Sequence, residues 1–170
     1  YSNVIELDSG ERIGYLVYTS FDDDYDTELL DALRRMATDG IDRMILDLRC
    51  NRGGNVSSAV ALSSALLGGE HAGDVLCTLN RNPKNSTTTT VTSCELEDVG
   101  IDCGIESLVV VCSGNTASAS ELIITGLRGF YEAPSNSFIK HSNNLLKMGC
   151  SGILCHSFQK YSPILGLFLF

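Results

Sequence analysis

The chain of 170 residues contains no tryptophan and only three prolines and three histidines. None of the histidines (His71, His141 and His156) lies in a recognisable catalytic motif, which disfavours a Ser-His-Asp triad. Cys155 and His156 are adjacent, and adjacent residues rarely chelate one metal ion together. The seven cysteines include no C-x-x-C pair to indicate a zinc site, and their odd number excludes a fully paired internal disulfide framework.

Long apolar runs and an excess of positive charge are also missing. The longest apolar stretch, residues 163–170, is far shorter than the roughly 20 residues that a membrane-spanning helix needs. The formal net charge of −9 disfavours binding to nucleic acid, because its phosphates repel an acidic surface. The acidic residues between positions 22 and 26 are interpreted as a solvated loop or helix start, and neither a metal ion nor a cofactor is expected. The chain begins at Tyr1 without a Met, and we interpret it as a piece of a longer protein.

Apolar periodicity predicts strands that alternate with helices. Strands are expected at residues 3–7, 12–18, 43–48, 74–79 and 108–112, with residues 81–92 as a loop or an edge strand. Helices are expected around Leu29, Leu33 and Met36 up to Gly40, at residues 56–67 and at residues 117–127. This alternation predicts an α/β fold whose partly parallel sheet is flanked by helices. Residues 131–170 show no clear period and are treated as a divergent tail of uncertain fold.

The first segment that points to chemistry follows the predicted strand at residues 43–48, where residues 47–54 read Asp-Leu-Arg-Cys-Asn-Arg-Gly-Gly. Paired glycines between a strand and a helix leave backbone N–H groups uncovered and let another backbone or a substrate approach closely. The alternative is a tight turn that needs positive φ angles. Strand alternation predicts that Asp47, Arg49 and Asn51 share one face and support the Gly53-Gly54 turn without acting on a substrate.

The second segment is Ser118-Ala119-Ser120-Glu121, which opens a helix after the strand at residues 108–112. A serine at a helix N-terminus lies where the helix dipole favours developing negative charge. The alternative is that Ser118 or Ser120 is only an N-cap, with Glu121 as its capping-box partner.

The two segments, in this order and about sixty residues apart, resemble peptidase family S41, the C-terminal-processing or tail-specific serine proteases. Thr19-Ser20-Phe21 resembles the family's segment before its Asp-Leu-Arg strand, and Gly126-Leu127-Arg128 resembles the forms common in Bacteroidetes. The resemblance covers about residues 10–130, so we treat residues 1–130 as a partial S41 catalytic core and residues 131–170 as the tail. It implies a layered ClpP/crotonase-like core. It also implies that Ser118 is the nucleophile, that Ala119 and the Gly53-Gly54 turn supply the oxyanion hole, and that Ser120 and Glu121 are a structural capping pair.

The chain departs from the family at the general base, which is a lysine about two dozen residues after the nucleophile, in a Gly-Lys segment. Position 143 is Asn, and no Gly-Lys pair occurs in the chain. Lys147, followed by Met148 and Gly149, comes closest to the pattern, with Lys140 as the reserve. A serine nucleophile needs such a base. Either one of these lysines packs against Ser118, or the tail is divergent or out-of-frame sequence and the base is missing.

Three hypotheses about function follow. The first is a serine-type endopeptidase that cleaves polypeptides near an unstructured C-terminus through an acyl-enzyme on Ser118, with a lysine as general base. The second is a catalytically incomplete homologue of the same fold that acts as a peptide-binding or scaffold module. The third is a crotonase-like acyl-CoA enzyme, which shares the layered fold. The family resemblance implies a location in the bacterial cell envelope or periplasm, while the substrate and the oligomeric state stay open.

Overall fold

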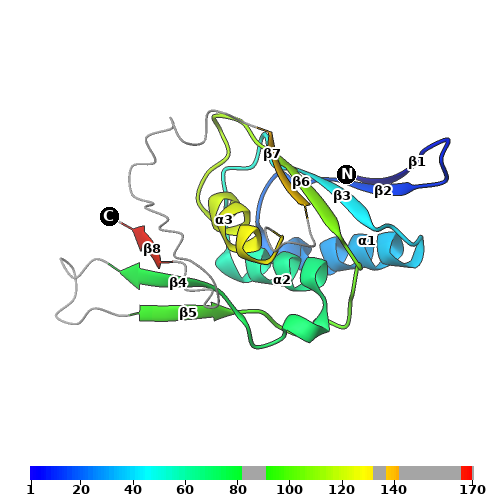
Figure 1. Cartoon of the computed structure of the whole chain (residues 1–170). Helices are drawn as coiled ribbons and strands as arrows, with labels where there is room; N and C mark the ends of the chain where they lie inside the picture. The colour runs from blue at the N-terminus through cyan, green and yellow to red at the C-terminus, as the bar shows by residue number, and fades with distance from the viewer. Residues whose placement is uncertain (82–90, 132–136, 142–165, 170) are drawn as a thin grey trace.

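The computed structural model describes residues 1–81, 91–131, 137–141 and 166–169 (Figure 1). The strands are β1 (Ser2–Glu6), β2 (Arg12–Val17), β3 (Arg43–Asp47), β4 (Val75–Arg81), β5 (Val91–Glu95), β6 (Ser107–Val111), β7 (Ser137–His141) and β8 (Gly166–Leu169). The helices are α1 (Asp26–Thr38), α2 (Val56–Leu67) and α3 (Ala119–Tyr131), with the short 3-10 helices η1 (Asp23–Tyr25) and η2 (Gly69–His71). The predicted α/β fold with a partly parallel sheet is confirmed.

The main sheet has the strand order β1-β2-β3-β6-β7. β1 runs antiparallel to β2, whereas β2, β3, β6 and β7 are parallel to one another. Helix α1 connects β2 to β3, and α3 connects β6 to β7. Because β3 and β6 are adjacent and parallel, with Asp47 level with Val111, the loops that leave them begin side by side.

One face of the main sheet is buried beneath helices α1, α2 and α3, which lie together on that side (Figure 1). Alternate strand residues point into this layer, and Leu16, Met44, Leu46, Leu108 and Val110 are all almost fully buried. The alternation is that of a half-buried strand. It explains why these short apolar segments could be recognised as strands from the sequence.

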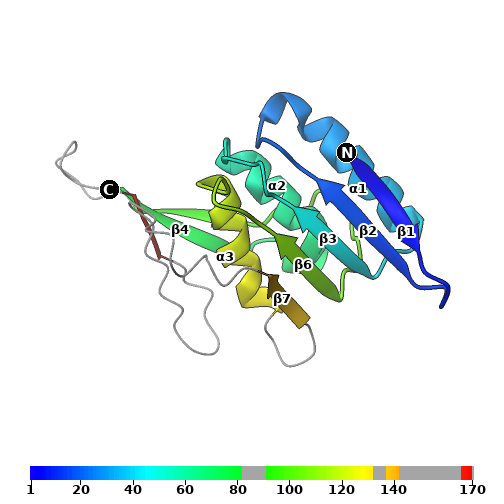
Figure 2. The same cartoon turned by 90° about the horizontal axis from the view of Figure 1, so that it is seen from above.

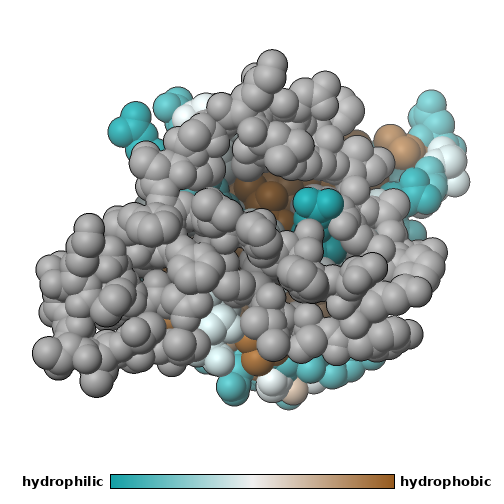
Figure 3. All heavy atoms as spheres, turned by 60° about the vertical axis from the view of Figure 1, so that its left-hand side comes forward, coloured by the Kyte–Doolittle hydropathy of each residue, from teal (hydrophilic) through white to brown (hydrophobic). Residues whose placement is uncertain are grey.

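The second sheet has the order β5-β4-β8 and lies beyond α3, away from β1 and β2 (Figure 2). It packs on the helix layer where Gly126 of α3 meets Leu76 of β4. A Cβ atom on this glycine would lie 2.6 Å from a methyl carbon of Leu76. Figure 3 turns this side of the molecule forward and shows apolar side chains among polar ones on the described part of the face.

Some element boundaries differ from those expected. β3 ends at Asp47, and α3 begins at Ala119 and runs on to Tyr131. Most of the region at residues 81–92 lies outside the described residues, between the end of β4 and the start of β5. In the tail, the structure describes only β7 and β8, which pair with β6 and β4. No helix among the described residues has the length and apolarity to cross a bilayer.

Candidate active site

The candidate site lies where the neighbouring strands β3 and β6 end. Two loops form it: the loop after β3 (residues 48–55, the glycine loop) and the loop after β6 (residues 112–118, the serine loop). Several hydrogen bonds join them. The N–H of Leu48 donates to the carbonyl of Val111 at 2.8 Å. The Thr116 hydroxyl donates to the carbonyl of Leu48 at 2.7 Å and accepts the Ser113 N–H at 2.9 Å. The Ser113 hydroxyl donates to the carbonyl of Arg49. These bonds fix the two loops relative to each other.

Asn51 belongs to the glycine loop, is fully buried, and forms hydrogen bonds to both loops. Its side-chain amide donates to the carbonyl of Tyr18 at 3.0 Å, and its side-chain oxygen accepts the N–H of Gly53 at 2.8 Å. Its backbone carbonyl accepts the Ala117 N–H at 3.3 Å and the Ser120 hydroxyl at 3.2 Å. Ser120 therefore bonds the glycine loop and does not cap α3, unlike the capping role expected for it.

The glycine turn packs directly against the serine. A Cβ atom on Gly53 would lie 2.6 Å from the Cβ of Ser118 and 2.9 Å from the amide nitrogen of Ala119. Gly53 and Gly54 have φ angles of +100° and +138°, so the tight-turn interpretation and the close-approach interpretation both hold here.

The backbone N–H groups of Gly53, Gly54 and Ala119 differ in whether they are already hydrogen-bonded. The N–H of Gly53 donates to the side chain of Asn51. Among the hydrogen bonds of the described residues, none uses the N–H of Gly54 or of Ala119. These two groups, and not Gly53, are the donors that the site leaves open.

Ser118 occupies a strained position at the start of α3. Its φ of +56° makes it the only non-glycine residue with a positive φ in the described part of the chain. Its N–H donates to the Glu121 carboxylate at 2.8 Å, which is the glutamate half of a capping box. The Ser118 side chain is exposed, and its hydroxyl has no hydrogen bond within the described residues. Ser118 is thus an N-cap by position, and its side chain is left accessible to solvent.

Arg49 of the glycine loop forms an ion pair with Asp47 at the end of β3. The exposed Arg49 guanidinium donates to the buried Asp47 carboxylate at 2.9 Å from Nε and 2.5 Å from Nη2. The Tyr15 hydroxyl donates to the same carboxylate at 2.9 Å. The Arg49 guanidinium lowers the pKa of Asp47, and the Asp47 carboxylate in turn raises the pKa of Tyr15.

The prediction that Asp47, Arg49 and Asn51 lie on one face of a strand is wrong for Asn51. β3 ends at Asp47, so strand alternation does not extend to Arg49 and Asn51. Arg49 is exposed while Asn51 is buried between the loops.

Replacing Arg49 with Ala should measurably lower the free energy of unfolding at pH 7, because the buried Asp47 carboxylate loses its charged donor. The lowered pKa of Asp47 means that the pair stabilises the fold above the unfolded-state pKa near 4, and that this contribution is lost as the pH falls through the lower folded-state pKa. The difference between wild type and variant should therefore shrink below about pH 4 in urea denaturation.

Arg34→Ala is the matched control for this prediction, because Arg34 forms an exposed pair with Asp31 on α1. Its effect should stay within about 0.5 kcal/mol at every pH. Unchanged stability of Arg49→Ala together with a clean loss of peptide hydrolysis would show instead that Arg49 acts on the substrate.

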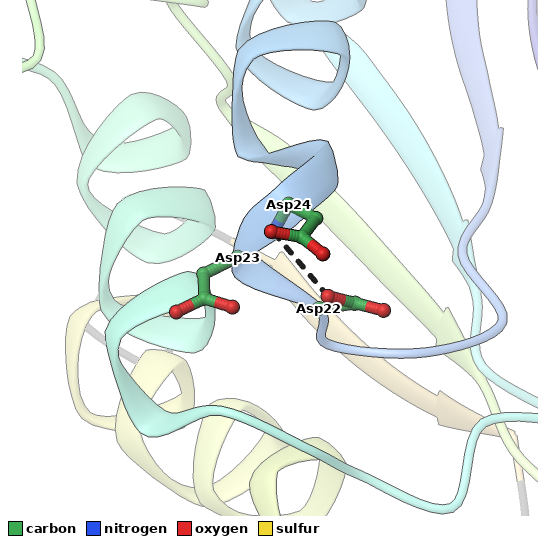
Figure 4. A group of neighbouring side chains, drawn as sticks. All are labelled: Asp22, Asp23 and Asp24. Atoms are coloured by element: carbon green, nitrogen blue, oxygen red, sulfur yellow. Dashed lines mark hydrogen bonds between the residues drawn. The ribbon is translucent and has the colours of Figure 1, made fainter.

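The acidic run Asp22-Asp23-Asp24 lies just before the N-terminus of α1 and directly after Phe21. Asp22 caps η1 by accepting the Asp24 N–H at 3.3 Å, and one carboxylate oxygen each of Asp22, Asp23 and Asp24 lies within 4.8 Å of the others (Figure 4). This matches the helix start expected from the sequence. Asp23 and Asp24 are exposed, and the arrangement carries no indication of a ligand beyond the carboxylates themselves.

Of the two lysines considered as general base, the structure describes the backbone of one. Lys147 lies outside the described residues. Lys140 lies in β7, where its Cα pairs with that of Val110, one residue before the end of β6. β7 therefore brings the Lys140 backbone next to the strand that leads into the serine loop.

Two contributors to the site were missed from the sequence. Thr116 ties the loops together through its hydroxyl, and Phe21 holds the glycine turn by donating its N–H to the Gly53 carbonyl at 3.0 Å and accepting the Asn55 N–H at 2.8 Å. A hydroxyl residue in the turn after β6 was the only local signal for Thr116. Nothing in the sequence indicates that Phe21 contacts the glycine turn, because it lies more than thirty residues before the glycines.

Comparisons with known proteins agree with this geometry. The model of peptidase family S41 matches residues 12–130. A carboxyl-terminal-processing protease from Picosynechococcus sp. is 30% identical over 120 residues, which cover 71% of this chain and 26% of that protein. The chain thus spans about a quarter of the length of this curated relative.

Solved structures show the same fold. An S41 protease from Bacteroides fragilis has a TM-score of 0.67 at 22% identity, covering 82% of this chain and 37% of that one. The photosystem II D1 C-terminal processing protease has a TM-score of 0.53 at 24% identity, covering 70% of this chain and 28% of that one.

Proposed function

Because the chain belongs to peptidase family S41, we propose that it carries the nucleophile-bearing core of a serine endopeptidase that cleaves polypeptides near their C-termini. The observation that carries this proposal is the contact between the glycine turn and Ser118, since two segments far apart in the sequence meet around one exposed hydroxyl. Family membership also argues against the acyl-CoA hypothesis.

In this proposal the Ser118 Oγ attacks the carbonyl carbon of the scissile peptide bond. The carbonyl oxygen becomes an oxyanion and accepts hydrogen bonds from the N–H groups of Ala119 and Gly54, which the fold leaves open. Two such fixed donors stabilise a tetrahedral intermediate, and removing one typically costs about 10²–10³-fold in kcat. The intermediate then collapses by breaking the C–N bond, and the leaving amine takes up the proton that came from Ser118. Water hydrolyses the resulting ester.

The site around Ser118 is arranged to hold the nucleophile still. The Glu121 carboxylate binds the Ser118 N–H, and Asn51 holds the glycine turn and the serine loop together. The hydroxyl therefore projects from a fixed backbone, which favours attack in one orientation.

A general base must accept the Ser118 proton, and we assign it to the tail. The backbone register of β7 favours Lys140, which is level with Val110, and Lys147 is the other candidate. Lys140→Ala should lower kcat by about 10²–10⁴-fold with little change in KM, as expected for loss of general-base assistance. Lys147→Ala and the control Lys160→Ala should retain activity.

The lysine variants separate three outcomes. Loss of activity in Lys147→Ala alone would move the base to that residue. Retained activity in both variants would exclude a base from this pair. An inactive wild type that still binds peptides would support the catalytically incomplete homologue instead.

The experiment that tests the function itself uses the wild-type chain and a folded protein that ends in an unstructured tail. Intact-mass spectrometry should show shortening from the C-terminus, and the same protein without its tail should stay uncut. Cleavage within the folded part, or none at all, would contradict the proposal. A location in the bacterial cell envelope goes with this function and rests on the family resemblance alone.

A further inference from the structure

Two cysteines face each other across the antiparallel pair formed by β4 and β5. Cys77 on β4 is level with Cys94 on β5 in the strand register. We propose that these two residues are an oxidisable pair that closes to a disulfide between the strands. This site lies apart from Ser118 and does not depend on the proposed peptidase activity.

The register itself meets the geometric requirement for a disulfide. Residues directly opposite in an antiparallel pair have Cα atoms about 4.5–5.5 Å apart. Disulfides span Cα separations of about 4.4–6.8 Å, and the Cα spacing of opposite residues falls within this range. Side chains of opposite residues also point to the same face of the sheet. The two cysteine side chains are thus neighbours on one face of the sheet.

Burial supports the same arrangement. Cys77 is fully buried and Cys94 is 9% exposed, and both belong to the hydrophobic core. The register shifts between Val75 and Cys77. Such a bulge places an extra residue on one strand, and it explains why the consecutive residues Leu76 and Cys77 are both buried. Leu76 packs on Gly126 of α3, so the cysteine pair lies next to the contact between this sheet and the helix that Ser118 begins.

The other cysteines of the described residues are placed differently. Cys50 is exposed in the glycine loop, and Cys112 is half-buried in the serine loop. Cys103 is buried, its thiol donates to the carbonyl of Leu33 at 3.9 Å, and burial raises its pKa to about 12. Among the paired strands of the described residues, Cys77 and Cys94 are the one cysteine pair in opposite positions.

The oxidant in this proposal is a low-molecular-weight disulfide such as oxidised glutathione. The Cys94 thiolate, on the more exposed member of the pair, attacks one glutathione sulfur and releases the first glutathione thiolate. The Cys77 thiolate then attacks the Cys94 sulfur of the mixed disulfide and releases the second. The two protons lost by the cysteines end on the two glutathione molecules, so one disulfide is exchanged for another.

Peptide mapping tests the proposal on the wild-type chain. The protein is incubated with oxidised glutathione, alkylated, and digested with trypsin and an endoproteinase that cuts after glutamate. A disulfide between Cys77 and Cys94 joins the peptides of residues 71–81 and 85–95, which contain no other cysteine. Modification of the exposed Cys50 in the same sample shows that the oxidant was active.

The expected result is the linked peptide pair, its disappearance on reduction, and a melting temperature several degrees higher for the oxidised protein, because the bond restricts the unfolded chain. Cys50→Ser should keep the linked pair, whereas Cys94→Ser should lose it. Recovery of Cys77 and Cys94 as alkylated thiols, or as separate glutathione adducts, while Cys50 is modified, would overturn the proposal.

Discussion

Replacing Ser118 with Ala should abolish labelling by a phosphonylating serine probe and lower peptide hydrolysis by about 10⁴-fold or more, because the acyl-enzyme can no longer form. The fold should be unaffected, since the Ser118 hydroxyl has no hydrogen bond within the described residues and its side chain is exposed. Mass spectrometry of the labelled peptide and a melting curve measure both effects on the same preparations.

Ser118→Gly is the matched variant for this prediction. It also removes the nucleophile, but it relieves the positive φ of +56° at this position. A left-handed conformation costs a residue with a Cβ roughly 1–2 kcal/mol, so the glycine variant should melt at or above the alanine variant. Both variants should remain unlabelled. A probe that labels another residue in an active wild-type sample, and leaves Ser118 untouched, would remove Ser118 as the nucleophile.

The second large effect is expected at Gly54. A Cβ atom at this position would lie 1.9 Å from the carbonyl oxygen of Phe21, and the residue has a φ of +138°. Gly54→Ala must therefore push the glycine loop away from Phe21, at a cost of about 3–5 kcal/mol of overpacking and backbone strain combined. Any protein that still folds should lose about 10²–10³-fold in kcat, because the Gly54 N–H moves out of place.

Gly10→Ala separates the cost of a positive φ from the cost of the steric clash with Phe21. Gly10 also has a positive φ, of +84°, but nothing lies within 4 Å of the position of its Cβ. This variant should cost only about 1–2 kcal/mol and leave hydrolysis unchanged. Urea denaturation and steady-state kinetics on both variants provide the comparison. Equal costs at the two positions, or full activity in Gly54→Ala, would show that the contact with Phe21 does not hold the turn in place.

The strands and helices of the first 130 residues were predictable because each carries its own local signal. The half-buried strands alternate apolar and polar residues, and α1 repeats Leu29, Leu33 and Met36 along one face. Gly40 and the Gly68-Gly69 pair end α1 and α2 at the expected places. Strand order had no such signal. The pairing of β3 with β6, across the residues that form α2, β4 and β5, depends on contacts far apart in the chain.

The candidate site was predictable in its residue types and not in its hydrogen bonds. The sequence pattern indicated Ser118, Ala119 and the glycine pair, and the structure brings these segments together. The choice between Gly53 and Gly54 as the open donor depended on Asn51, whose side chain takes up the Gly53 N–H. A strand pattern placed Asn51 on the same face as Arg49, and only the end of β3 at Asp47 corrected this.

The family, the layered α/β fold and the serine proposed as the nucleophile could be identified from the sequence, because periodicity and short motifs are properties of neighbouring residues. The folded structure was needed to show which backbone N–H groups stay open, how Phe21 and Thr116 hold the loops, and that Cys77 lies opposite Cys94. Each of these depends on groups that are distant in the chain and meet when the strands pair and the helices pack. Their distances are set by the whole fold and by no single segment.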